Sequence, residues 1–168
     1  MFKNKAPRIY LIGGYYFVTV KTHFNKPIFC DQNLAKIFSQ ALKFLKQRGD
    51  FELIAGVLLP DHFHLLLKPK KKNISEIMHD LKSFTAQEIN NHYRQGILTL
   101  PDCNNTGEAS SLTCKNIINL PSVWQRSFYY HIITSENDFS NHYNYIAGNP
   151  QKHRYISINE NWPWLWFG

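Results

Sequence analysis

The feature that most limits the fold is a pair of short apolar segments placed between two amphipathic ones. The segments Phe51–Pro60 (FELIAGVLLP) and Phe63–Pro69 (FHLLLKP) are rich in aliphatic and aromatic residues and end at turn formers, which is typical of strands. The Pro-Asp pair between them suits a turn that joins antiparallel neighbours. The predicted fold is therefore built around an antiparallel strand pair.

One helix is predicted before this strand pair in the sequence, and two are predicted after it. Over residues 31–48, apolar residues recur at helical spacing, with an aspartate as the cap at the start and Gly49 as the stop. The same spacing recurs over 74–93. A third helix is predicted over 136–150, and Pro150 is expected to end it.

Two more segments complete the pattern. Tyr15–Phe24 and Trp124–Thr134 are rich in β-branched and aromatic residues and are predicted to be strands. The order is then strand, helix, strand, strand, helix, strand, followed by one added C-terminal helix. This order predicts an α+β fold, the ferredoxin-like βαββαβ sandwich, in which helices cover one face of an antiparallel sheet.

We expect one domain over 1–168, because the length is that of one ordinary domain and no internal repeat is visible. The segment 94–120 carries turn formers and little periodicity, so a long loop is predicted there. The tail 151–168 ends in NWPWLWFG, which is aromatic enough that we expect it to pack on the body of the domain.

The charge favours a polyanionic partner. Lys and Arg number 19 against 12 Asp and Glu, and aromatic residues make up 15% of the chain. Rings beside cations suit single-stranded nucleic acid, although any one ring can equally be a core residue. Three cysteines in no CxxC pair predict no disulfide framework, and no apolar run has the length of a membrane helix. We therefore expect a soluble intracellular protein without a membrane partner.

Two histidines stand within the apolar run VLLPDHFHLLLK. In a strand, His62 and His64 point to the same face and Phe63 to the other. Two such imidazoles can share a divalent ion, although each can also simply bond a neighbour on a polar sheet face. A metal site needs a third ligand in addition.

The third predicted helix offers that ligand. Tyr145 and Asn149 are four residues apart and share a helix face, whereas Tyr143 faces elsewhere. A phenol beside a metal-ligating amide is a sensible nucleophile site for phosphate chemistry. The alternatives are a core tyrosine and an ordinary Asn-Pro helix end. Candidate phosphate-binding residues are Lys68, Lys70, Lys71, Lys72, Gln125 and Arg126, although a charge run is as often only a solvated loop.

These motifs together resemble a known family. The segments LLPDHFHLLL, VWQRSFYYHIITSENDF, YNYIAGNPQKHRYI and NWPWLWF are similar in order and spacing to those of the single-tyrosine HUH transposases of the insertion-sequence type, especially the REP-associated branch. The resemblance covers most of the chain outside the loop 94–120. It implies a cytoplasmic bacterial enzyme that cleaves and transfers single-stranded DNA beside hairpin or palindromic (REP-like) structures, as a monomer or homodimer.

The resemblance also implies roles for single residues. His62 and His64 would be ligands of Mg²⁺ or Mn²⁺, and Asn149 would complete the metal site. Tyr145 would attack the scissile phosphate, form a 5′-phosphotyrosine link and free a 3′-hydroxyl. Two other functions stay open: a ferredoxin-like nucleic-acid binding module without catalysis, and a metal-dependent phosphodiesterase that uses water.

Overall fold

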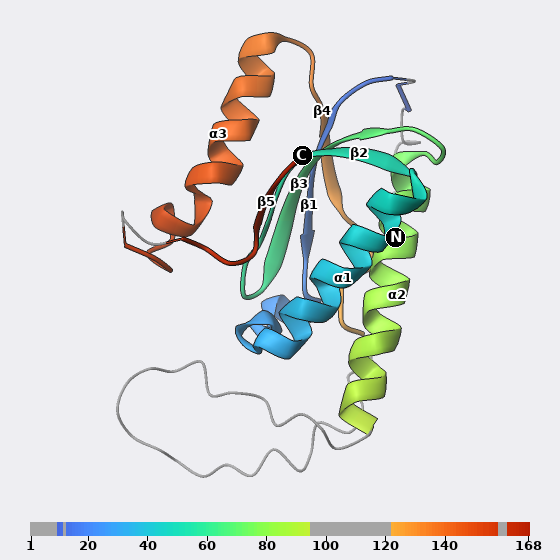
Figure 1. Ribbon diagram of the computed structural model, residues 1–168, viewed down its shortest axis with the longest axis vertical. Helices are drawn as coiled ribbons and strands as arrows, with labels where there is room; N and C mark the ends of the chain where they lie inside the picture. The colour runs from blue at the N-terminus through green and yellow to red at the C-terminus, as the bar shows by residue number, and fades with distance from the viewer. Residues whose placement is uncertain (1–9, 12, 95–121, 158–160) are drawn as a thin grey trace, which may run out of the picture.

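The structure is a computed structural model that describes residues 10–11, 13–94, 122–157 and 161–168. Figure 1 shows a sheet with helices on both sides. The strands are β1 (Tyr16–Lys21), β2 (Phe51–Leu58), β3 (His62–Pro69), β4 (Tyr129–Ile132) and β5 (Leu165–Phe167), and the α-helices are α1 (Gln32–Arg48), α2 (Ile74–Arg94) and α3 (Glu136–Lys152). Two short 3₁₀ turns, His23–Asn25 and Ile28–Cys30, link β1 to α1.

The strands form one antiparallel sheet in the order β4-β1-β3-β2-β5. The first four strands give the ferredoxin-like arrangement, so the predicted α+β class is confirmed. The aromatic tail contributes β5, which pairs with β2 along its free edge. The expectation that NWPWLWFG packs on the domain is thereby confirmed, because Leu165–Phe167 form this strand and the Trp162 indole N–H donates to the Leu58 carbonyl.

The two faces of the sheet carry different helices. Val18, Phe63 and Leu65 belong to the large core beneath α1 and α2. Phe17 and Leu66, which alternate with them along β1 and β3, pack in a smaller cluster with Ile146 of α3. Helices α1 and α2 therefore cover one face and α3 covers the other, as Figure 1 shows.

Local signals fixed the ends of α1. The Asp31 side chain accepts a hydrogen bond from the backbone N–H of Asn33 and caps the helix. Gly49 ends it in the left-handed conformation, with φ of 79°. Both predicted signals are confirmed.

The prediction that Pro150 ends the third helix is wrong, because α3 continues through it to Lys152. A proline in the last turn forfeits only one helical hydrogen bond. The turns that follow are closed without the proline N–H: the N–H of His153 bonds the Asn149 carbonyl at 3.1 Å, and that of Tyr155 bonds the Pro150 carbonyl at 2.9 Å.

The strand predicted over 124–134 is too long, because β4 holds only Tyr129–Ile132. Trp124 makes a single bridge to Thr22 and leaves the sheet. Its indole N–H donates to the Thr85 hydroxyl of α2 at 2.8 Å, inside the core. The strand predicted over 15–24 likewise ends early, since Phe24 turns the chain with a positive φ of 57°.

The predicted loop 94–120 falls almost wholly outside the described residues, except for Arg94, which ends α2. No helix in the described part of the chain combines the length and apolar character needed to span a membrane.

Candidate metal and tyrosine site

Strand β3 holds both histidines on the face that α3 covers. Leu66, two residues after His64, packs in the cluster with α3, whereas Phe63 is buried beneath α1 and α2. The ring centroids of His62 and His64 are 4.8 Å apart. The alternation of the strand thus brings the two imidazoles together, facing the third helix.

His64 is buried, with 5% of its surface exposed. Its Nδ1 lies 2.8 Å from the Thr19 hydroxyl, across the register pair that joins β1 and β3. Its Nε2 is buried and has no hydrogen-bond partner among the described residues. Burial, followed by the repulsion of His62, His153 and Lys21, lowers the pKa of His64 to about 3. The ring is therefore neutral, and when Nδ1–H donates to Thr19, Nε2 presents a lone pair.

His62 is oriented by its neighbour in the chain. The Asp61 carboxylate lies 2.6 Å from Nδ1 of His62. Carboxylates in this position fix the tautomer of metal-binding histidines and leave Nε2 as the ligand atom. Sequence analysis missed Asp61, although its place directly before the HFH motif is a visible signal.

Tyr145 of α3 lies against His64. Its ring meets His64 edge to face, with centroids 5.2 Å apart, and is 5.9 Å from Phe17. The tyrosine is 37% exposed. It borders a hollow of about 310 Å³ whose lining residues are Phe17, Thr19, His64, Asn141, His142 and Tyr145. The phenol and the His64 ring therefore border the same space.

The rival tyrosine lies elsewhere. The Tyr143 ring packs on Phe167 of β5, with centroids 5.4 Å apart. The ammonium of Lys152 lies 5.2 Å from the centroid of the Tyr145 ring. Of the two tyrosines, Tyr145 is therefore the one that contacts His64 and lies near a cation, Lys152.

Asn149 lies one helical turn after Tyr145 and is fully buried. Neither its Oδ1 nor its Nδ2 has a hydrogen-bond partner among the described residues. Buried polar side chains are nearly always paired, so two unpaired amide atoms on one side chain call for an explanation. A bound ligand would supply the missing partner.

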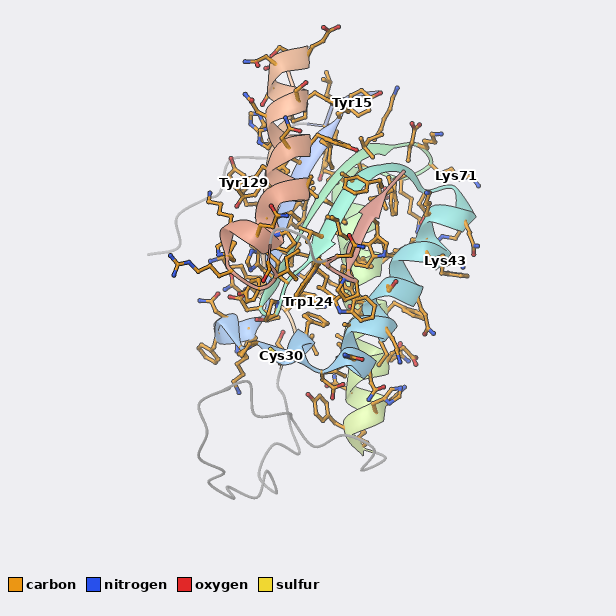
Figure 2. The ribbon with its side chains drawn as sticks, turned by 60° about the vertical axis from the view of Figure 1, so that its left-hand side comes forward. Tyr15, Cys30, Lys43, Lys71, Trp124 and Tyr129 are labelled. Atoms are coloured by element: carbon orange, nitrogen blue, oxygen red, sulfur yellow. The ribbon has the colours of Figure 1, made fainter. Side chains whose placement is uncertain are left out.

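The predicted lysines lie away from this site. Lys70–72 follow the end of β3 opposite to His62, and Figure 2 shows Lys71 on the side of the molecule away from α3. Lys70 pairs with Glu52 at 3.1 Å and Lys72 with Asp80 at 2.5 Å. Lys71 donates to the Arg48 carbonyl at 2.6 Å. The Lys68 ammonium lies over the Tyr15 ring at 5.2 Å.

Gln125 and Arg126 lie nearer to the histidines. The backbone N–H of Gln125 donates to the carbonyl of Lys21, the residue that pairs with His62 across the sheet. Lys82 of α2 donates to the carbonyls of both Gln125 and Arg126, at 2.7 and 3.1 Å. The backbone of the segment is thus fixed to the same end of the sheet as His62, whereas the Arg126 side chain lines a hollow over α2 with Lys72 and Lys82.

Sequence analysis also missed a second cluster of ligand-type side chains, His131 of β4 with Asp138 and His142 of α3. The four-residue spacing of Asp138 and His142 on a helix was a visible signal. The partnership with His131 was not, because it depends on how α3 packs beside β4.

Residues 13–99 match the family described as "Transposase IS200 like". The chain belongs to this family. The resemblance to insertion-sequence transposases is thus confirmed, and with it the assignment of the chain as a transposase-type enzyme. The match includes β3 and its histidines and ends before α3.

Relatives extend the similarity to nearly the whole chain. A Haemophilus influenzae protein classed with the REP-associated tyrosine transposases is 27% identical over 157 residues, which is 92% of this chain and 80% of the relative. The REP-associated tyrosine transposase of Escherichia coli is 25% identical over 160 residues, 95% of this chain and 80% of the relative.

A solved structure shares the fold. The structure of a REP-associated tyrosine transposase bound to a REP hairpin matches with a TM-score of 0.69 at 22% identity, over 97% of this chain and 82% of that one. This likeness supports the five-stranded architecture independently of the family match.

Proposed function

We propose that this IS200-type transposase is a metal-dependent single-stranded DNA endonuclease and strand transferase that uses Tyr145 as its nucleophile. The observation that carries the proposal is the contact between Tyr145 and His64, whose buried Nε2 lacks a partner among the described residues, at one exposed hollow. A phenol beside a neutral metal-ligating imidazole is suited to attack on a phosphodiester.

The side chains fit a divalent cation. His62 and His64 each have one ring nitrogen engaged, with Asp61 and Thr19 respectively, which leaves the other for an ion. The unpaired amide of Asn149 offers an oxygen. We assign His62, His64 and Asn149 as the ligands of Mg²⁺ or Mn²⁺, of which Mn²⁺ tolerates imidazole better. When bound, such an ion polarises a phosphate oxygen.

Tyr145 then performs the covalent step. Its Oη attacks the phosphorus and forms a new P–O bond while the phenol proton leaves to solvent. The bond from phosphorus to the 3′ oxygen breaks, and this oxygen takes up a proton to become a 3′-hydroxyl. The 5′-phosphotyrosine link keeps the phosphodiester energy, so that a second 3′-hydroxyl can reverse the step without ATP. The nearby Lys152 offers positive charge to the phosphate.

We assign the DNA partner as single-stranded DNA with a hairpin, because the solved relative of the same fold is bound to a REP hairpin and this chain carries a net charge of +7. Gln125 and Arg126, at the His62 end of the sheet, are the first candidates for contacts to the DNA backbone. Lys68 and Lys70–72 would extend this contact along β3, and those already paired with acidic residues would contribute less.

The test is incubation of the chain with 3′-labelled hairpin DNA and Mn²⁺, followed by a denaturing gel, because the 5′-phosphotyrosine link retains the fragment that carries the 3′ end. Wild type is expected to yield a protein band that carries label, and Tyr145→Phe is expected to yield none. Tyr143→Phe is the matched control and should behave as wild type, because that ring packs on Phe167. Cleavage that survives in Tyr145→Phe would instead identify a phosphodiesterase that uses water. Binding without cleavage by wild type would identify a binding module.

A further inference from the structure

A second group of metal-ligating side chains lies close to the tyrosine site. His131 Nε2 is 2.8 Å from Asp138 Oδ2, and His142 Nδ1 is 3.0 Å from Asp138 Oδ1. The three candidate ligand atoms all lie within 4.8 Å of one another. Spacings of this kind are those of atoms that surround one ion at bond lengths of about 2 Å.

The carboxylate at the centre is held in place by the start of α3. Ser135 caps the helix by accepting the N–H of Asp138, and Asp138 Oδ2 in turn accepts the N–H of Thr134 at 3.0 Å. The hydrogen bonds from His131 and from Thr134 keep the pKa of Asp138 below its usual value. His142, one turn later, directs Nδ1 at this carboxylate and at the Asp138 carbonyl, 2.9 Å away. The Asp138 carboxylate is thus ionised, and contacts with the backbone orient it and the His142 ring.

We propose that His131, Asp138 and His142 bind a divalent transition-metal ion, for which Zn²⁺ is the best match. Two imidazole nitrogens and one carboxylate oxygen are a donor set that Zn²⁺ accepts, with water in the open position. Mg²⁺ is a poor match because it prefers oxygen ligands in an octahedron. On binding, the ring nitrogens that face Asp138 turn lone pairs to the ion, and their protons leave to solvent or move to the other ring nitrogen.

This cluster shares no side chain with the proposed catalytic ligands, although His142 lines the same hollow as His64 and Tyr145. The Phe17 ring contacts both groups, His64 at 5.3 Å and His142 at 4.5 Å between centroids. We assign this ion a structural role, because its ligands come from β4 and α3 and none of them is a proposed catalytic ligand. The ion would join β4 to the helix that carries Tyr145, and would fix the position of that helix against the sheet.

The experiment removes the histidines of the proposed catalytic site and measures zinc binding at His131, Asp138 and His142. In full-length His62→Ala/His64→Ala protein, isothermal titration with ZnCl₂ is expected to show one bound equivalent. Adding His142→Ala should weaken this binding at least about a hundredfold, because loss of a ligand exceeds loss of an outer partner. His79→Ala is the matched control and should change nothing, since His79 is 77% exposed and stands near a single carboxylate, Asp80.

Two further measurements keep the inference testable. Asp138→Asn retains the size of the side chain and should also lose zinc, which covers the case in which His142→Ala does not fold. In wild type, Zn²⁺ should raise the melting temperature, and a chelator should reverse the rise. No zinc in the His62→Ala/His64→Ala protein, or equal binding after His142→Ala or Asp138→Asn, would overturn the inference. The DNA-cleavage outcome is independent of this titration, so failure of one proposal leaves the other standing.

Discussion

The two unpaired amide atoms of Asn149 lead to a quantitative prediction. If Asn149 is a metal ligand, its buried amide lacks a partner whenever no ion is bound, and this destabilises the metal-free protein. One buried side-chain amide without partners, taken as a single polar group, costs about 1–3 kcal/mol, and an apolar side chain of similar shape removes that cost. Asn149→Leu is therefore expected to stabilise the metal-free protein by about 1–3 kcal/mol, which is a rise of roughly 2–12 °C in melting temperature for a chain of this size.

The same substitution should abolish the response to the ion. At a Mn²⁺ concentration about 100 times the Kd, wild type gains about 2.7 kcal/mol of stability from binding. The leucine variant lacks the ligand and should gain little at this site. Any ion held at the His131 cluster contributes equally to both proteins and cancels in the comparison. The difference in free energy of unfolding between Asn149→Leu and wild type should therefore be smaller in Mn²⁺ than in EDTA, or should change sign.

The assay is urea or thermal unfolding of both proteins in EDTA and in Mn²⁺. Thr85→Val is the matched control, because the hydroxyl of Thr85 is buried but paired with Trp124 and with the Leu81 carbonyl. That variant should lose about 1–3 kcal/mol, since it leaves the indole N–H unpaired. Our reasoning is refuted if Asn149→Leu is clearly less stable than wild type in EDTA, or if Mn²⁺ stabilises both equally.

Three other predictions concern neighbouring interactions. Thr19→Val removes the hydrogen-bond partner of His64 Nδ1 and should weaken Mn²⁺ binding by about 10–100-fold in a calorimetric titration. Arg126→Ala should lower affinity for hairpin DNA evenly across sequences and reduce the salt slope of binding by about one, measured by fluorescence anisotropy at several salt concentrations. The hydrogen bond from Lys72, with those from Arg48 and His79, lowers the pKa of Asp80 from 3.8 to about 2. Its folded pKa is below the unfolded one, so its stabilising contribution is complete above the unfolded value and is lost as pH falls toward 2. Urea unfolding of Asp80→Asn should therefore show a smaller loss of stability across this acid range than wild type.

The proposed second metal site would give the tyrosine helix two attachments to the sheet. Apolar packing of Ile146 against the sheet is the first, and the contact of Asp138 and His142 with His131 is the second. Because Tyr145 lies between these attachments in the sequence, movement of either end would change its distance from His64. Cleavage measured with and without zinc in His131→Ala protein would report how far the second attachment matters.

Local patterns in the sequence sufficed for most elements. Helical spacing, the Asp31 cap and the Gly49 stop placed α1, and the alternation of β3 put His62 and His64 on one face. These features depend on residues close together in the chain, so they can be read from the sequence. The prediction that Tyr145 and Asn149 share a helix face likewise follows from their four-residue spacing and the helix period alone.

Tertiary packing decided the rest. Local rules penalise a proline inside a helix, so they did not show that α3 continues through Pro150, where the hydrogen bonds from His153 and Tyr155 close the turns that follow. Nor could the sequence show that three of the predicted DNA-binding lysines already bond Glu52, Asp80 and the Arg48 carbonyl, since those partners come from other elements.

The chemistry of the site follows the same division. The sequence by itself indicated the candidate metal ligands and the candidate nucleophile, because residue type and local period fix the chemistry of a side chain and the face on which it lies. Only the tertiary structure brought Tyr145 to His64 and His142 to His131, and left Asn149 buried without a partner among the described residues. The first contact joins segments about eighty residues apart, and the second joins strand β4 to helix α3. Contacts between separate elements are set by how those elements pack, which local sequence patterns do not show.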